Sequence, residues 1–107
     1  MEEKGNVSVK INVIKRNGQE VDFDISKIVN AIRKANAEVS GIYQMNDYQI
    51  NAVADNIAKK VQNSSHAVNV EDIQDMVESG IMDMRGYEVA QKYVRYRYKR
   101  EISRKSN

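Results

Sequence analysis

The stretch "VIKRNGQEVDFDISKIV", Val13 to Val29, decides how the chain begins to fold. Residues 7–14 alternate between apolar and polar side chains, which predicts a half-buried strand. Its apolar face consists of Val7, Val9, Ile11 and Val13. Asn17–Gly18 is a strong hairpin turn signal, so we expect the strand to turn back on itself within the quoted stretch.

The same alternation predicts the register of the hairpin. A two-residue loop at Asn17–Gly18 would pair Val13 with Asp22, which mixes the apolar and polar faces. A three-residue loop, with Gly18 in the left-handed conformation, pairs Val13 with Val21 instead. A slip of one residue moves every side chain to the other face, so we expect the three-residue loop.

The remainder of the chain is predicted to form four helices and one more strand. The first helix starts at an N-cap, Asp24 or Ser26, and ends before Gly41. The second runs from about residue 46 to 63, the third contains "VEDIQDMVESGIMDM", and the last is "YEVAQKYVRYRYKREISRK" after Gly86. Residues 66–70 are a candidate third strand. We predict an α+β fold, in which a three-stranded β cap (the hairpin plus one short strand) covers a four-helix bundle.

Length and composition limit the possible functions. The 107 residues fit one domain, expected over 1–107 with its core at about 7–101. The chain has no cysteine and one histidine, His66, so neither a metal site nor a thiol nucleophile is expected. It contains no P-loop or dinucleotide-binding glycine motif, and we predict no catalytic residues. Because it has no apolar run of membrane-spanning length and no signal core, we expect a cytoplasmic protein.

Positive charge is concentrated at the C-terminal end. Residues 1–90 hold 10 Lys and Arg against 14 Asp and Glu, whereas residues 91–107 hold 7 against 1. A solvated helix face would explain this excess, and so would contact with a polyanion.

The sharpest feature of the sequence is a cluster of three cations, Lys15, Arg16 and Lys27. All three are expected near the junction of the hairpin and the first helix, whose N-terminus carries unpaired N–H groups and partial positive charge. A polyphosphate would neutralise these features together. In the alternative interpretation, surface ion pairs with acidic residues of the hairpin neutralise the cations, and these acids are Glu20, Asp22 and Asp24.

Three ordered segments resemble the ATP-cone domain family. They are "VIKRNGQEVDFDISKIVNAI", "VNVEDIQDMVESGI" and "AQKYVRYRYKR", and the likeness extends over about residues 7–101. The resemblance implies a small regulatory domain of ribonucleotide reductases, most similar to that of the oxygen-independent glycyl-radical enzyme. Its implied ligands are ATP, which activates, and dATP, which inhibits, bound with Mg²⁺. Its implied partners are the catalytic domain of the reductase and a second copy of the chain in a nucleotide-dependent oligomer.

The resemblance also implies which residues bind nucleotide. Val13, Lys15, Arg16 and Gly18 match the first motif of the family, and Lys27 and Ile28 match the pair on its first helix. Phe23 stands where an apolar residue lines the pocket, and Ile73 and Gln74 border the base. The last helix offers further candidates: Tyr96, Arg97 and Lys99.

Two other functions compete with this interpretation. The basic last helix carries Tyr93, Tyr96 and Tyr98 between its cations, which is compatible with a nucleic-acid-binding module, as in a transcriptional regulator. Tyr93 and Tyr96 have core-facing spacing, which argues against base stacking by these residues. The chain could also be an oligomerisation module that has kept the fold and lost the nucleotide, although all three cations are intact.

Overall fold

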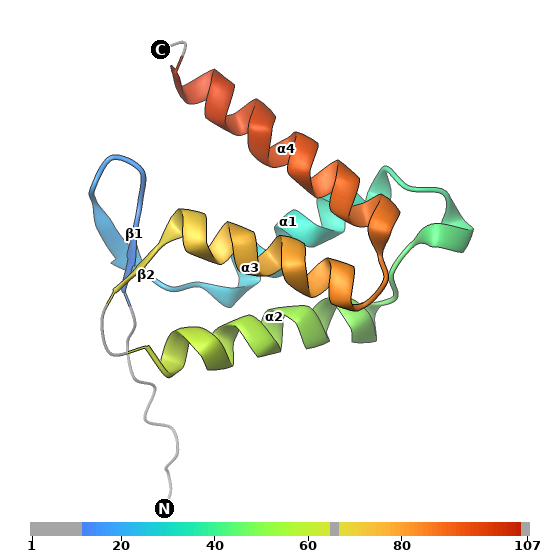
Figure 1. Ribbon diagram of the computed structural model, residues 1–107, viewed down its shortest axis with the longest axis horizontal. Helices are drawn as coiled ribbons and strands as arrows, with labels where there is room; N and C mark the ends of the chain where they lie inside the picture. Colours follow the sequence, from blue (N-terminus) through green and yellow to red (C-terminus); the bar gives the residue numbers. More distant parts are fainter. Residues whose placement is uncertain (1–11, 65–66, 106–107) are drawn as a thin grey trace, which may run out of the picture.

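The computed structural model describes residues 12–64 and 67–105, with side chains as far as residue 103. A small sheet lies at one end of a bundle of four helices (Figure 1). In chain order the elements are β1 (Asn12–Ile14), β2 (Glu20–Asp22), α1 (Ile25–Ala37), the 3₁₀ helix η2 (Gly41–Tyr43), α2 (Asp47–Gln62), β3 (Val68–Asn69), α3 (Val70–Asp83) and α4 (Tyr87–Lys105). The predicted α+β fold, with a three-stranded cap over four helices, is confirmed.

The hairpin has the register that the alternation predicts. Val13 pairs with Val21 in the antiparallel ladder between β1 and β2. The Lys15 N–H donates to the Gln19 carbonyl at 2.8 Å, and the Gly18 N–H donates to the Lys15 carbonyl at 2.9 Å. Gly18 has φ 86°, the left-handed conformation that glycine adopts at little cost. The loop therefore turns over three residues and keeps Val13 facing the core.

The third strand ties the hairpin to the helices. β3 pairs in parallel with β1, which is the central strand in the order β2-β1-β3. β3 is followed directly by α3, because Asn69 ends the strand and Val70 begins the helix. The strand expected over residues 66–70 is thus present as Val68–Asn69, and His66 lies outside the described residues.

The helices begin at residues that satisfy their free N–H groups. The Asp24 carboxylate accepts from the Ser26 backbone N–H at 3.0 Å, so Asp24 rather than Ser26 is the N-cap of α1. At α2, Asn46 and Gln49 form a capping box, with reciprocal bonds of 2.8 and 2.9 Å. The first turn of α3 carries two acids, Glu71 and Asp72, as the helix dipole favours.

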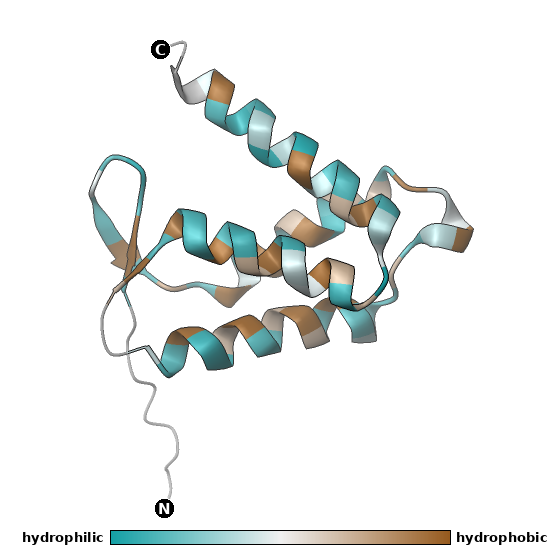
Figure 2. Ribbon diagram, viewed as in Figure 1, coloured by the Kyte–Doolittle hydropathy of each residue, from teal (hydrophilic) through white to brown (hydrophobic). Residues whose placement is uncertain are grey.

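The core lies between the four helices, and α1 and α3 each contact both α2 and α4. Apolar residues of the helices turn toward one another across this space (Figure 2). Its most deeply buried side chains are Ile32, Ile50, Val53, Ile57, Val61, Val77, Ile81 and Val89. α2 and α3 approach closely at Gly80, where an added Cβ would lie 2.8 Å from Val53 Cγ1. Within the described ranges, every helix is too short or too polar to cross a membrane.

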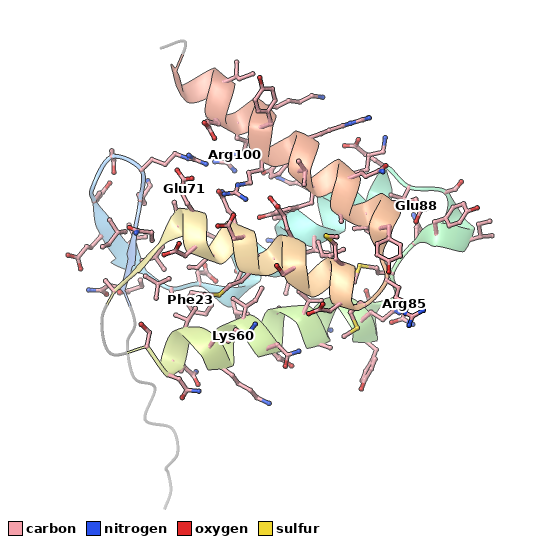
Figure 3. All side chains as sticks on the ribbon, in the orientation of Figure 1. Phe23, Lys60, Glu71, Arg85, Glu88 and Arg100 are labelled. Carbon is pink, nitrogen blue, oxygen red and sulfur yellow. The ribbon has the colours of Figure 1, made fainter. Side chains whose placement is uncertain are left out.

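α3 ends in a turn with an unusual residue at its left-handed position. Arg85 has φ 63°, where glycine is the common choice. The Gly86 N–H donates to the Ile81 carbonyl at 3.0 Å and the Arg85 N–H donates to the Met82 carbonyl at 2.8 Å, which is the bonding of a Schellman motif. Gly86 lies in a tightly packed place, because a Cβ there would be 3.0 Å from Met45 Sδ and 3.2 Å from Ile81 Cγ2. Arg85 and Glu88 mark the end of the bundle opposite Glu71 and Phe23 (Figure 3).

Candidate functional site

Arg16 leaves the hairpin loop and reaches the start of α3. Its Nη1 donates to Glu71 Oε2 at 2.5 Å, and its Nη2 donates to Gln74 Oε1 at 3.1 Å. Glu101 Oε1, on α4, lies 3.5 Å from the same Nη1. The side chain of Arg16 is 19% exposed. One guanidinium therefore joins the hairpin to α3 and to α4, although its partners lie more than 50 residues away in sequence.

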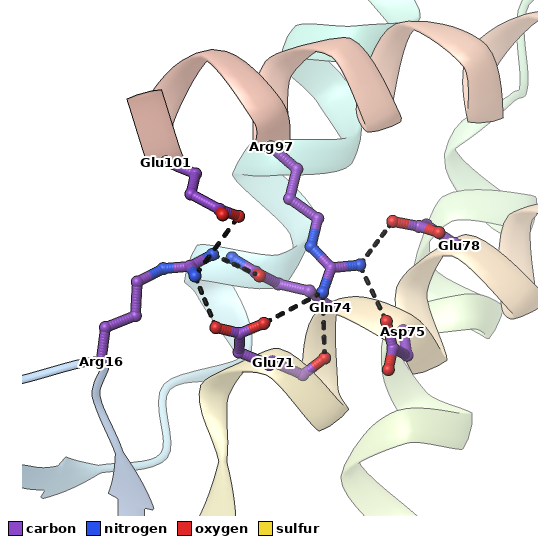
Figure 4. Close-up of polar contacts among 7 residues, drawn as sticks. All are labelled: Arg16, Glu71, Gln74, Asp75, Glu78, Arg97 and Glu101. Carbon is purple, nitrogen blue, oxygen red and sulfur yellow. Dashed lines mark hydrogen bonds and ion pairs between the residues drawn. The ribbon is translucent and has the colours of Figure 1, made fainter. Parts of the chain in front are cut away.

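Arg97 extends from α4 toward α3 (Figure 4). Its Nη1 donates to Glu78 Oε2 at 2.6 Å and to Asp75 Oδ1 at 2.8 Å. Burial by itself would lower the pKa of Arg97, but the hydrogen bonds that Arg97 donates to Glu78 and Asp75 outweigh this effect and raise that pKa above its ordinary value. Arg97 is thus a permanent cation that bridges α4 and α3.

Glu71 connects the two arginines. Its Oε2 accepts from Arg16, and its Oε1 lies 3.7 Å from Arg97 Nη2 (Figure 4). We call the seven residues in Figure 4 the arginine network; they are Arg16, Glu71, Gln74, Asp75, Glu78, Arg97 and Glu101. Two guanidinium groups here face four carboxylates. Because the guanidinium fork matches phosphate as well as carboxylate, the same two arginines can bind a phosphate group.

Lys15 and Lys27 lie on the hairpin and on the first turn of α1, and both are exposed. Among the described residues, neither lysine forms an ion pair with the hairpin acids. The pKa of Asp24 is lowered, chiefly by its hydrogen bonds with Ser26 and to a smaller extent by the charge of Lys27. Arg16 pairs with acids of α3 and α4, so the alternative in which Glu20, Asp22 and Asp24 neutralise it is wrong.

The other residues predicted to bind nucleotide lie at different depths. Val13, Ile28 and Ile73 are buried in the core below the hairpin, and Phe23 is half-buried against it. Gly18 shapes the loop, and the amide oxygen of Gln74 accepts a hydrogen bond from Arg16. The structure therefore brings Arg16 and Gln74 into direct contact and links Arg97 to Arg16 through Glu71. Lys99 is exposed and does not belong to the arginine network.

Tyr96 packs toward α1 rather than toward the arginine network. Its ring lies 5.8 Å from Lys34 Nζ and 5.7 Å from the Arg100 guanidinium carbon, within cation–π range. Arg100 also donates to the Tyr96 hydroxyl at 3.0 Å, and this hydrogen bond is the main cause of the lowered pKa of Tyr96. Tyr93 is only 4% exposed, and burial raises its pKa to about 12. Tyr93 thus lies in the core, as its spacing predicts, whereas Tyr96 is only half-buried and is held by Lys34 and Arg100.

A groove of about 620 Å³ lies beside the start of α3, and one residue of the arginine network, Asp75, lines it. Ile14, Lys60, Val68, Asp72 and Met76 are among the residues that line it. It contains none of the residues that the sequence predicted to bind nucleotide. No group of three or more metal-ligating side chains that could hold an ion occurs in residues 12–64 and 67–105.

The acidic half of the arginine network was not predicted. Glu71, Asp75 and Glu78 follow i, i+4, i+7 spacing, which places three acids on one face of α3. Arg97 and Glu101 follow i, i+4 spacing on α4. These spacings are the signal that could have identified two complementary faces, but only the fold shows that they meet.

Comparison with known proteins points to one family. The family model described as "ATP cone domain" matches residues 11–102. An anaerobic ribonucleoside-triphosphate reductase from Haemophilus influenzae is 36% identical over 93 residues, which is 86% of this chain and 13% of the reductase. The alpha subunit of a ribonucleoside-diphosphate reductase from Chlamydia pneumoniae is 32% identical over 111 residues, 95% of this chain and 10% of that subunit. The chain thus spans about a tenth of the length of these two relatives.

Proposed function

The chain belongs to the ATP-cone family, and we propose that it is a regulatory nucleotide-binding domain that senses ATP against dATP and controls a ribonucleotide reductase. In this proposal, residues 1–107 form one ATP-cone domain with its core at about 7–101. The domain carries no catalytic residue of its own and acts on the catalytic domain of the reductase in the cytoplasm. Nucleotide binding changes the association of copies of the chain.

The arginine network is the observation that carries this proposal. Arg16, Gln74 and Arg97 come from three separate elements and lie within one set of hydrogen bonds and ion pairs. Lys15 and Lys27 are exposed and add two point charges from the hairpin and from the N-terminus of α1. Such a combination of forked and point cations fits the oxygens of a polyphosphate.

The remaining predicted residues have places in the same proposal. Phe23 is half-buried and offers apolar surface for the base and sugar, and Val13, Ile28 and Ile73 belong to the core cluster against which it packs. Gly18 lets the loop approach the phosphates. Tyr96 and Lys99 contribute from α4. Magnesium ion enters bound to the nucleotide, which would offset part of the negative charge that four carboxylates bring to the arginine network.

Calorimetric titration with ATP and with dATP tests the proposal directly. We expect saturable binding of both nucleotides. Binding should raise the free energy of unfolding by RT ln(1 + [L]/Kd), and this gain should appear as a higher melting temperature. The variants Lys15→Ala and Lys27→Ala should weaken binding about ten-fold each, because each removes a charge-assisted contact. Lys59→Ala is the matched control, since Lys59 is an exposed lysine in the last turn of α2.

Two outcomes would contradict the proposal. One is the absence of a heat of binding and of any rise in melting temperature at millimolar ATP and dATP. The other is an equal loss of affinity in Lys59→Ala, which would indicate a diffuse charge effect instead of a site. Measurement of the oligomeric state of the protein with each nucleotide then tests the proposed change in association.

A further inference from the structure

We propose that Glu71 competes with nucleotide phosphate for Arg16, so that Glu71 is a positioning residue that sets the affinity of the site. The inference rests on the proposed function and extends it to a residue that the family resemblance did not indicate. It is drawn from the geometry of the arginine network, in which one carboxylate faces both arginines.

The contact between Glu71 and Arg16 uses the donors that a phosphate would need. Arg16 directs Nη1 to Glu71 at 2.5 Å and Nη2 to Gln74 at 3.1 Å, so both ends of its fork are engaged. A phosphate oxygen bound to that fork has to replace at least the carboxylate, because the two anions would repel each other at the same donor. Gln74 is neutral and can keep its bond while the anion is exchanged.

Exposure distinguishes Glu71 from a carboxylate that only supports the fold. Its side chain is 52% exposed, whereas the side chains of Arg16 and Arg97 are 19% and 17% exposed. The arginines are therefore sheltered in place, and Glu71 is free to swing into solvent when another anion arrives. Asp75 and Glu78 still neutralise Arg97 after Glu71 has left.

The exchange also connects the site to α4. Glu101 lies 3.5 Å from the Nη1 of Arg16 that Glu71 occupies. An anion with more than one free oxygen at Nη1 competes with Glu101 as well, which weakens this ion pair between the hairpin and α4. Phosphate binding and the ion pair between Glu71 and Arg16 are linked reciprocally. A change that weakens this ion pair therefore strengthens the binding of phosphate.

Titration of the Glu71→Gln variant with ATP and with inorganic tripolyphosphate tests the inference. We expect both ligands to bind about five-fold more tightly than to the wild-type chain, the factor that corresponds to losing one well-placed exposed ion pair. Tripolyphosphate shows whether the gain arises at the phosphates, because it has no base. Circular dichroism and the melting temperature of the variant without ligand verify that it folds.

Asp72→Asn is the matched control. Asp72 lies in the same first turn of α3, and it is exposed and acidic, but it does not belong to the arginine network. Its neutralisation should change affinity less than about two-fold, which measures the general effect of removing one negative charge. In an Arg16→Ala background, Glu71→Gln should give no more than this general effect, because the shared donor is gone.

The outcomes separate this inference from the proposed function. If the wild-type chain binds neither ATP nor dATP, both fall. If the wild-type chain binds ATP, the inference alone falls when Glu71→Gln binds equally or more weakly. The same conclusion follows when Asp72→Asn matches its gain, or when the gain persists without Arg16.

Discussion

Replacing Gly80 by alanine should destabilise the domain, although alanine is the better helix former. The added Cβ would lie 2.8 Å from Val53 Cγ1, closer than such atoms approach in folded proteins. Val53 is 2% exposed and enclosed by the core, so α2 and α3 have to move apart. Overpacking of this kind lowers the free energy of unfolding by about 1–3 kcal/mol, and the higher helix propensity of alanine than of glycine raises it by about 1 kcal/mol.

The net expectation is a loss of about 1 kcal/mol, or roughly 4–8 °C in melting temperature for a domain of this size. Urea unfolding followed by circular dichroism measures the free energy of unfolding. Gly41→Ala is the control, because a Cβ at Gly41 would have no atom within 4 Å. In a Val53→Ala background the clash disappears, so Gly80→Ala should there stabilise the chain.

A Gly80→Ala variant as stable as the wild-type chain would refute the packing argument. So would a Val53→Ala background that leaves the cost unchanged, since the two substitutions would then be additive and the residues not in contact.

Three further predictions concern the ends of helices and one buried tyrosine. Arg85→Gly should stabilise the domain by up to about 1 kcal/mol in urea unfolding, because it removes a left-handed non-glycine residue; a loss would contradict this. Tyr93 has a pKa raised to about 12 against an ordinary 10.0, so the folded state holds its proton more tightly. The stabilisation that this tighter proton binding gives is complete below pH 10 and is lost as the pH rises toward 12. Tyr93→Phe should therefore flatten the fall in the free energy of unfolding over that range. Asp24→Ala should lower the melting temperature at pH 6, and the difference should shrink as the pH falls below 3.8, the ordinary pKa of that lowered carboxyl. A difference that persists at pH 2 would show that the charge of the cap is irrelevant.

The elements of the fold could be predicted because they depend on local periodicity. The hairpin register followed from a period of two, since only one pairing of Val13 kept the apolar side chains together. The start of α1 followed from capping chemistry at Asp24, and the start of α2 near residue 46 followed from its apolar periodicity. The parallel pairing of β3 with β1 could not be predicted, because nothing local relates strands more than 50 residues apart.

Sequence reasoning singled out the two arginines of the arginine network but none of its four acids. Arg16 and Lys27 were identified by their place at the hairpin and the helix start, where charge has a local meaning. Glu71 and Glu101 have no such local signal, because acids are common on exposed helix faces. Their role depends on how α3 and α4 pack, which is a property of the whole fold.

The sequence distance within the arginine network has a consequence for synthesis of the chain. Arg16 is 55 residues from Glu71, and translation proceeds at about 5–20 residues per second, so several seconds separate the emergence of the two residues. Glu101, on the last helix, emerges later still. A nascent chain or a fragment that lacks α4 therefore has only part of this contact set. The complete arginine network can therefore form only after nearly the whole domain has been synthesised.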